Sequence, residues 1–263
     1  MRLLTGTFVS CFVLSNFQIP RADAQRAFPQ AIPRGKKLTP LQQRTQLLHT
    51  LVEKMPHTER GDEHTALSAT KYNICGIVAL QGAPGTKEKV GTSKLREEER
   101  NAVLKIARTM EGLLCDWLST GLVSGVRAAK KLLGFQSFHK NGFASALATG
   151  VNHCTLIHTD VDFFPTILIV TAEEVVVDKA GQPVVALYFC FPTKGVAVGL
   201  AVGDAIIFNP TIEHCCSYKS AAYANVDVYT TCEYTKTAVV GLNDNSIGLT
   251  AQQKKMRKIM QSF

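Results

Sequence analysis

Three residues have the types and spacing of a metal site: His158, Asp160 and His214. Side chains at positions i and i+2 of a β-strand point to the same face, so a strand over residues 156–160 would project His158 and Asp160 together. His214 follows an apolar run and an Asn-Pro pair, and a closed β architecture would bring it to the same place. Imidazole nitrogens and carboxylate oxygens both ligate metals. The pattern therefore predicts a metal site with three protein ligands.

The three residues together indicate the kind of metal site more specifically than the tripeptide His158-Thr159-Asp160 does alone. Two histidines and one carboxylate on one face of an octahedron leave the opposite positions open, as in non-heme iron(II) oxygenases. A structural zinc site would instead be closed by four protein ligands. The sequence contains no Cys-x-x-Cys pair, Gly-rich phosphate loop or nucleophile elbow. The three residues thus favour iron with open positions for a co-substrate and dioxygen.

The elements that must position these ligands are short, apolar and rich in β-branched residues after Gly150. Turn signals, such as Gly203-Asp204, separate the runs. Many short strands at this spacing predict a sandwich or jelly roll. Strands are expected over residues 154–158, 166–177, 184–191, 195–198, 205–208, 214–218 and 226–234.

Helical periodicity lies ahead of the strands. Apolar residues recur at three- and four-residue steps from Lys94 to Leu118, which predicts a helix that packs against a sheet. A shorter helix is expected over residues 123–133. Another should begin at Pro40, with Thr39 as its cap, and stop at Pro56. Helices first and strands afterwards predict an α+β fold with helices packed on one outer face of the β unit.

The chain divides into four segments. Residues 1–24 match a secretory signal peptide that ends in Ala22-Asp23-Ala24, with an organellar targeting segment or an unstructured terminus as the alternative. Residues 25–90 form a lead-in with one helix and a short strand, which together make an N-terminal helical extension. Residues 91–245 form the jelly-roll domain with its supporting helices. Residues 246–263 form a basic tail.

Four stretches carry the ligands and the strands beside them: Ile157-His158-Thr159-Asp160, Ala186-Leu187-Tyr188-Phe189-Cys190-Phe191-Pro192, Gly203-Asp204-Ala205-Ile206-Ile207-Phe208 and Pro210-Thr211-Ile212-Glu213-His214. Together they resemble the double-stranded β-helix of Fe(II)/2-oxoglutarate-dependent dioxygenases, including the order of elements in the prolyl-hydroxylase and nucleic-acid-demodifying branches. The resemblance spans about residues 150–240, and it extends to uncharacterised proteins of algae and other protists.

The resemblance implies a set of roles. His158, Asp160 and His214 would bind Fe(II) and form the catalytic centre. The co-substrate 2-oxoglutarate would chelate the metal and be decarboxylated to succinate, while a protein, nucleic acid or small molecule is hydroxylated or oxidatively demodified. Ascorbate is a candidate reductant. The protein's own part is open coordination, orientation of the ligands and exclusion of water.

The sequence departs from the family at the anchor for the far carboxylate of 2-oxoglutarate. Family members commonly use an arginine or lysine there, but no arginine lies between Arg127 and Arg257. Lysine can replace it as a point charge without bidentate geometry. The candidates are Lys219, preferred because it is closest in sequence to His214, and Lys236. Tyr188 could add a hydroxyl to the same pocket.

Two further residues are weaker candidates. Asp162 would share a strand face with Asp160 and is an alternative ligand. His153 precedes the expected strand and is interpreted as a surface or loop histidine.

Two other functions compete with the oxygenase interpretation. A cupin-like metal-binding protein would have a similar second motif, but cupins usually carry His-x-His and a glutamate in the first motif, where this chain has His158-Thr159-Asp160. A catalytically inactive β-sandwich binding module is the other alternative, because a fold does not fix a function.

Composition sets wider bounds. With 263 residues, 46% hydrophobic and 19% charged, the chain is an ordinary globular protein. The net charge of +8 permits a nucleic-acid partner without establishing one. No segment after the N-terminal run is apolar enough to predict a membrane span. Eight cysteines would become an odd number if Cys11 left with a signal peptide, so the compartment, secretory or intracellular, is not fixed.

Overall fold

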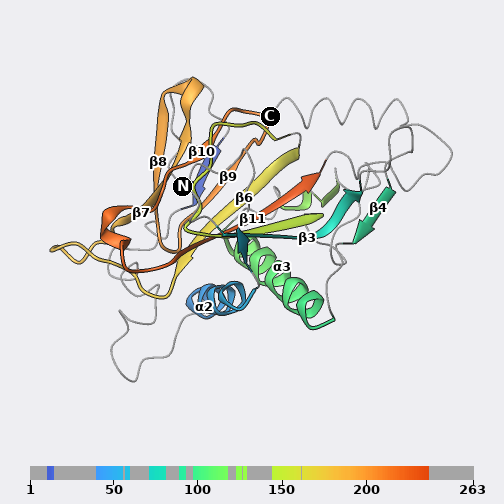
Figure 1. Cartoon of the computed structure of the whole chain (residues 1–263), viewed down its shortest axis with the longest axis horizontal. Coiled ribbons are helices and arrows are strands. Elements are labelled where there is room, and N and C mark those ends of the chain that lie inside the picture. The colour runs from blue at the N-terminus through green and yellow to red at the C-terminus, as the bar shows by residue number, and fades with distance from the viewer. Residues whose placement is uncertain are drawn as a thin grey trace.

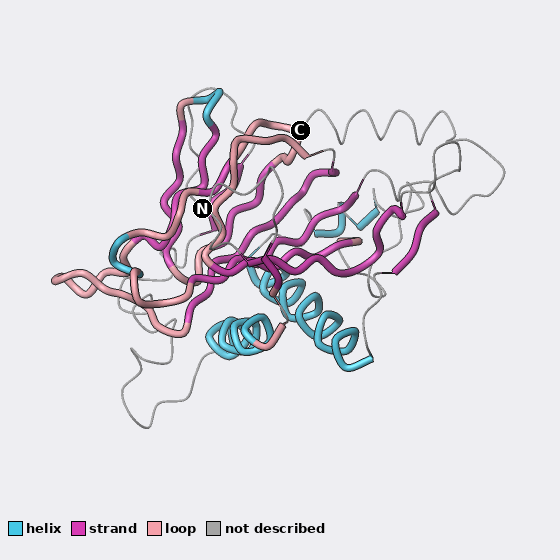
Figure 2. Tube along the Cα trace, in the orientation of Figure 1, coloured by secondary structure: helices cyan, strands magenta, loops and turns pink. Residues whose placement is uncertain are grey.

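Two antiparallel β-sheets and two helices organise the described part of the chain (Figures 1 and 2). The structure is a computed structural model, and it describes residues 11–14, 40–55, 57–59, 71–80, 89–92, 97–117, 123–125, 127–128, 144–160 and 162–236. Among the helices in these ranges, none has the length and hydropathy needed to span a membrane.

The larger sheet contains eight strands. Its neighbours in space are far apart in sequence: β6 lies between β9 and β11, and β11 lies between β6 and β5. Its strands, in spatial order, are β1 (Cys11–Leu14), β9 (Ala205–Phe208), β6 (Asp162–Ala172), β11 (Val228–Lys236), β5 (Ala146–Val151), β3 (Lys71–Leu80) and β2 (Thr58–Glu59), with β4 (Lys89–Thr92) paired to β3.

The smaller sheet contains three strands and one further pairing. Its order is β10 (Cys215–Cys216), β7 (Val185–Phe191) and β8 (Val196–Ala201). A short 3-10 helix, η3 (Pro192–Lys194), joins β7 to β8, and Gly195 closes it in the left-handed region, where glycine is favoured. An isolated antiparallel bridge between His158 and His214 extends this sheet beyond β10.

The chain alternates between the two sheets. From β5 in the large sheet it passes to the His158 bridge in the small one, returns in β6, crosses to β7 and β8, returns in β9, crosses to β10 and returns in β11. This winding is that of a jelly roll, the double-stranded β-helix. The fold is therefore α+β with a double-stranded β-helix, as the sequence indicates.

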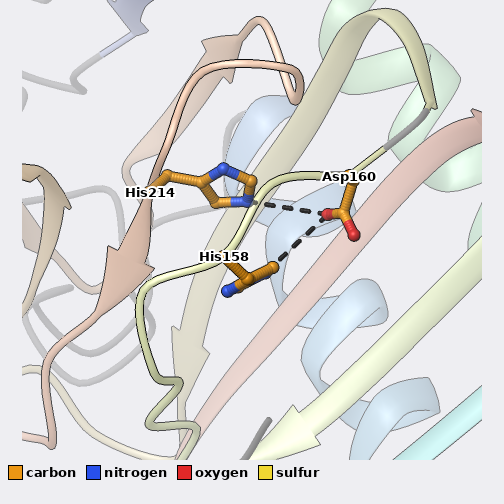
Figure 3. Close-up of side chains that lie close together, drawn as sticks. All are labelled: His158, Asp160 and His214. Carbon is orange, nitrogen blue, oxygen red and sulfur yellow. Dashed lines mark ion pairs between the residues drawn. The ribbon is translucent and has the colours of Figure 1, made fainter. Parts of the chain in front are cut away.

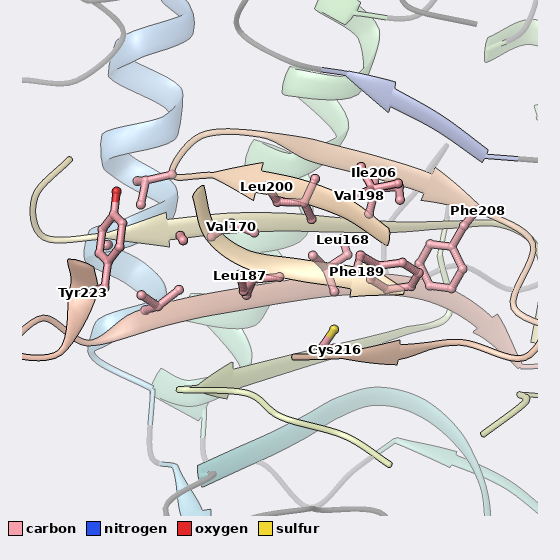
Figure 4. Packing of buried hydrophobic residues seen from close by; sticks show 14 of the residues in the cluster. Leu168, Val170, Leu187, Phe189, Val198, Leu200, Ile206, Phe208, Cys216 and Tyr223 are labelled. Carbon is pink, nitrogen blue, oxygen red and sulfur yellow. The ribbon is translucent and has the colours of Figure 1, made fainter. Parts of the chain in front are cut away.

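An apolar core joins the two sheets (Figure 4). Every second residue of β7 points into it, including Leu187, Phe189 and Phe191, because side chains alternate along a strand. They meet residues of β6 and β9 from the opposite sheet, such as Leu168 and Phe208. Tyr223 in the 3-10 helix η4 (Ala221–Tyr223) is fully buried at one end, and its hydroxyl accepts a hydrogen bond from the Val176 N–H.

A second core lies between the large sheet and the helices α2 (Pro40–Glu53) and α3 (Glu97–Trp117). Both helices cover the same outer face of the sheet (Figure 1). The face of α3 that the sequence assigns to packing is buried as expected. Its members include Val103, Ile106, Met110 and Leu113, which pack with Leu48 and Val52 of α2 and with Leu147, Ile167, Ile169 and Ile207 of the sheet.

Most sequence predictions of elements agree with the structure, with shifts at their ends. β9 has the predicted bounds, α2 begins at the predicted Pro40, and β6, β7, β8 and β11 overlap the predicted strands. The predicted lead-in strand is β3, which pairs with β5 and so belongs to the large sheet. The strand expected over residues 154–158 is wrong as a regular strand, because this segment makes only isolated bridges, at Thr155 and His158.

Other predictions concern segments that the structure covers only in part. Within the predicted signal peptide, Cys11–Leu14 forms β1 and pairs with β9, and the peptide itself stays a prediction. Of the predicted helix over residues 123–133, residues 123–125 and 127–128 are helical and residues 129–133 lie outside the described ranges. The basic tail from residue 246 also lies outside them.

Replacing Ile106 by alanine should destabilise the fold. Ile106 is fully buried between α3 and the sheet, so its loss leaves a cavity worth roughly 2–5 kcal/mol of the free energy of unfolding. Lys105→Ala on the exposed side of the same helix should change it by no more than about 0.5 kcal/mol. Urea unfolding of both variants measures this, and equal effects would contradict the assignment of this helix face to the core.

Candidate metal centre

The centre begins with a backbone pairing between two histidines. His158 N–H donates to the His214 carbonyl at 3.1 Å, and His214 N–H donates to the His158 carbonyl at 3.0 Å. Such a reciprocal pair places the two residues directly opposite each other in an antiparallel ladder, so their side chains leave the sheet on the same face. The imidazole ring centroids are 4.5 Å apart. The fold thus brings together two residues from the opposite ends of the ligand stretch.

Backbone carbonyls orient both rings. The Nδ1 atom of His158 lies 2.7 Å from the Leu156 carbonyl oxygen, and the Nδ1 atom of His214 lies 2.8 Å from the Ile212 carbonyl oxygen. A carbonyl can only accept, so each Nδ1 carries the proton and donates. The lone pair of each neutral ring is therefore on Nε2. Metal-ligating histidines are commonly held in this way, with the far nitrogen donating to a carbonyl or carboxylate.

Asp160 completes the group (Figure 3). Its N–H donates to the Pro210 carbonyl at 2.9 Å, which fixes the backbone beside the turn that leads to His214. Its Oδ2 lies 3.8 Å from Nε2 of His158 and 3.6 Å from Nε2 of His214. Both histidines therefore present their lone-pair nitrogens to the same carboxylate oxygen.

The donor set and spacing fit a metal ion. The three ligand atoms lie within 4.8 Å of one another. Two ligands bound to one ion at about 2.1 Å, with angles of 90–110°, are about 3.0–3.4 Å apart, so only a small inward movement is needed. Within the described residues no other group of three histidine, cysteine, aspartate or glutamate side chains meets this criterion. The residues present match two nitrogens and one oxygen with open positions.

Aromatic side chains hold His214 from the core side. Phe189 stacks on its imidazole with an interplanar angle of 13° and a centroid distance of 5.5 Å, and Phe208 contacts it at 5.0 Å. Only 5% of the His214 side chain is exposed, against 22% for His158 and 45% for Asp160. The centre is therefore packed on the His214 side and open to solvent on the side of Asp160.

A partly buried thiol, that of Cys232, lies close to the carboxylates. Burial raises the pKa of Cys232 well above its ordinary value, and the negative charges of Asp160 and Asp162 raise it further. Cys232 on β11 is thus a neutral thiol that contributes apolar volume beside the centre. Sequence reasoning did not single it out.

The predicted anchor residues come from three different segments of the chain. Lys219 follows β10, and its Nζ donates to the Val226 carbonyl at 2.9 Å. Lys236 ends β11 opposite Asp162 of β6, and its side chain lies outside the described part of the structure. Tyr188 is 45% exposed on the face of β7 opposite to Phe189, so the structure does not bring it to the three ligands.

Two weaker candidates take definite positions. Asp162 is buried at the start of β6 and does not belong to the group of three. His153 lies in the loop that follows β5, which is one of the two expected positions, but it is buried, so the other expectation, a surface position, is wrong. A Cβ atom at Gly150 would lie 2.9 Å from Nδ1 of His153, so the ring fits only because residue 150 has no side chain. The Gly-to-His spacing is a signal that sequence reasoning missed.

Phe189 and Phe208 contact His214, and sequence reasoning did not identify either residue as part of the candidate centre. Alternation in Val185–Phe191 predicts that Phe189 and Phe191 share one face. That this face meets His214 depends on the pairing of Cys216 with Phe189, which brings β10 beside β7. The sequence therefore indicates that Phe189 is buried, but it does not indicate that Phe189 contacts His214.

Comparisons with known proteins find several similar solved structures. No family model matches the chain, and no curated protein matches it. Similar structures include NgTET1 in complex with 5mC DNA (12% identity, TM-score 0.43, covering 85% of this chain and 98% of that chain). An oxidoreductase of the 2OG-Fe(II) oxygenase family from Burkholderia pseudomallei is 10% identical (TM-score 0.38, 70% of this chain and 75% of that chain).

A third similar structure is the viral collagen prolyl hydroxylase of Paramecium Bursaria Chlorella virus-1 in a 2OG complex (10% identity, TM-score 0.31, covering 63% of this chain and 77% of that chain). Identities of 10–12% do not identify a function. The geometry of the three ligands has to carry that conclusion.

Replacing Asp160 by asparagine should weaken metal binding by more than about a hundredfold, because the centre loses its only anionic ligand. Asp162→Asn should change the affinity by no more than a few-fold, since Asp162 lies outside the group of three. Anaerobic calorimetry with Fe(II) measures both affinities, with thermal unfolding as a check that each variant is folded. Loss of binding in Asp162→Asn and not in Asp160→Asn would make Asp162 the ligand.

Proposed function

We propose that this protein is an Fe(II)/2-oxoglutarate-dependent dioxygenase that hydroxylates or oxidatively demodifies an organic substrate. One observation carries the proposal: Nε2 of His158, Nε2 of His214 and a carboxylate oxygen of Asp160 converge at the open side of a jelly roll. A cupin-like site would need a further histidine or glutamate, and among the described residues none joins this group.

The chain's own residues would do three things at this centre. The backbone carbonyls of Leu156 and Ile212 select the neutral tautomer with its lone pair on Nε2 and hold both Nε2 atoms toward one point. The Asp160 carboxylate adds a single negative charge, so a divalent ion keeps net positive charge to attract the anionic co-substrate. Bound iron, with 2-oxoglutarate and dioxygen, would supply the oxidising chemistry.

The asymmetric burial of the ligands supports a direction of approach for substrate. His214 is covered by Phe189 and Phe208, which exclude water from the inner side. Asp160 and His158 are partly exposed, so substrate would reach the centre from their side. Leu156 and Ile157, exposed by 50% and 58%, precede His158 at this side.

The anchor for the far carboxylate of 2-oxoglutarate is proposed to be Lys219 or Lys236. Lys219 gives one of its three N–H donors to the Val226 carbonyl and keeps two for another acceptor. Lys236 lies on β11, paired with Asp162 two residues after the ligand Asp160. Lys236 is proposed because of its position on β11, and Lys219 because it is close in sequence to His214. Mutation of each lysine distinguishes the two candidates.

Purified protein with Fe(II), ascorbate and 2-oxoglutarate should form succinate slowly even without a substrate. His158→Ala should abolish this turnover because it removes a metal ligand, whereas Lys194→Ala, an exposed change in η3, should leave it unaltered. Chromatography of succinate measures the rate. Stoichiometric zinc with no binding of 2-oxoglutarate by calorimetry would contradict the oxygenase and favour a cupin-like protein.

Lys219→Ala and Lys236→Ala should separate the two anchor candidates. Loss of the anchoring charge should raise the 2-oxoglutarate concentration needed for half-maximal turnover by about tenfold or more, in one variant only. Lys194→Ala is again the control for a general loss of positive charge. If neither variant changes this requirement, both lysines are removed from the assignment.

A further inference from the structure

Two cysteines on neighbouring strands of the small sheet face each other. Cys215 of β10 is the direct antiparallel partner of Cys190 of β7. The next pair along, Cys216 and Phe189, points into the core between the sheets. Because successive side chains of a strand alternate between faces, Cys190 and Cys215 share the opposite, outer face. Both are partly exposed, whereas Cys216 is buried.

The two thiols are close enough to react. Directly opposed residues in an antiparallel pair have Cα atoms about 4.5–5.5 Å apart, within the range of about 4.4–6.8 Å found across disulfides. Burial raises the pKa of the Cys215 thiol, and the neighbouring Cys190 thiol raises it further. Cys154 is buried nearby, at the segment that pairs with Cys216 through Thr155, but it has no cross-strand cysteine partner in the ladder.

We propose that Cys190 and Cys215 form a redox modification site that takes up a peroxide-class oxidant and closes to a disulfide. In the first step one thiol reduces the peroxide O–O bond and becomes a sulfenic acid, with release of one water molecule. In the second step the partner sulfur attacks the sulfenic sulfur, the S–S bond forms and a second water molecule leaves. Two thiols and one hydrogen peroxide thus give one disulfide and two waters.

The closed site would fasten β10 to β7 next to the metal centre. Cys215 directly follows the ligand His214, and the link would enclose residues 191–214, which contain β8 and β9. Oxidation therefore restrains the strand that leads away from His214 while the ligand's own ring stays packed on Phe189. The inference rests on strand register and not on bound metal, so it can fail or succeed independently of the proposed oxygenase function.

Peptide mapping of the full chain tests the site. Reduced, metal-free protein is treated with hydrogen peroxide at about pH 8.5, near the ordinary pKa of a thiol, then blocked with N-ethylmaleimide and digested with trypsin. Cleavage after Lys179, Lys194 and Lys219 places Cys190 and Cys215 in separate peptides, 180–194 and 195–219, and Cys154 in a third. The expected product is peptide 180–194 joined to peptide 195–219 with the loss of two hydrogens.

Variants assign the link. Cys190→Ser and Cys215→Ser should each abolish the joined peptide, whereas Cys154→Ser should retain it. Circular dichroism of each reduced variant confirms that it is folded, and native-state crosslinking of wild type with a bifunctional maleimide gives a second measurement. The proposal is overturned if the peroxide-treated wild type gives peptides 180–194 and 195–219 only as separate species with all their cysteines blocked, if the link persists in Cys215→Ser through Cys216, or if it joins the peptide that contains Cys154.

Discussion

The structure of the candidate centre depends on one backbone pairing, that of His158 with His214. Two reciprocal hydrogen bonds hold these residues side by side, although a strand of the large sheet, two of the small sheet and another of the large sheet lie between them in sequence. The jelly roll makes the pairing possible because its chain returns repeatedly to neighbouring positions in the small sheet. Both imidazoles then leave the same face of the sheet. Asp160 follows His158 by two residues, and its carboxylate lies close to both rings.

Packing and hydrogen bonds fix the orientation of the two paired histidine rings. His214 packs against the core aromatics Phe189 and Phe208, which restricts rotation of its ring, and the Ile212 carbonyl sets which nitrogen is protonated. His158 is held by the Leu156 carbonyl in the same way, with less burial. Preorganisation of ligands on rigid elements is what a metal site requires, because misplacement by even an ångström weakens binding and catalysis.

Much of this arrangement could be predicted from the sequence. The apolar run Ala205–Phe208 has the predicted bounds because four consecutive buried residues between turn residues leave little freedom. The packing face of α3 follows from its helical periodicity. Residue type and the resemblance predicted the three candidate ligands, and the structure brings their side chains together. Their binding of iron stays a proposal.

The rest could not be predicted because it depends on partners distant in sequence. The segment before His158 has the composition of a strand, but only isolated bridges form there, so the i, i+2 rule gave the right neighbours for an incomplete reason. His153 is buried because Gly150 leaves room for its ring. The outer pair of Cys190 and Cys215 follows only from the register of β7 and β10. No spacing rule in one sequence specifies such a register.

The central claim is that His158, Asp160 and His214 hold one metal ion and leave its remaining positions open. A crystal structure of the Fe(II)-loaded protein, with anomalous scattering recorded at the iron edge, tests it most directly. The account predicts one anomalous peak bonded to Nε2 of both histidines and to a carboxylate oxygen of Asp160, with solvent or co-substrate at the other positions. A peak elsewhere in the molecule, or a fourth protein ligand that closes the coordination sphere, would contradict it.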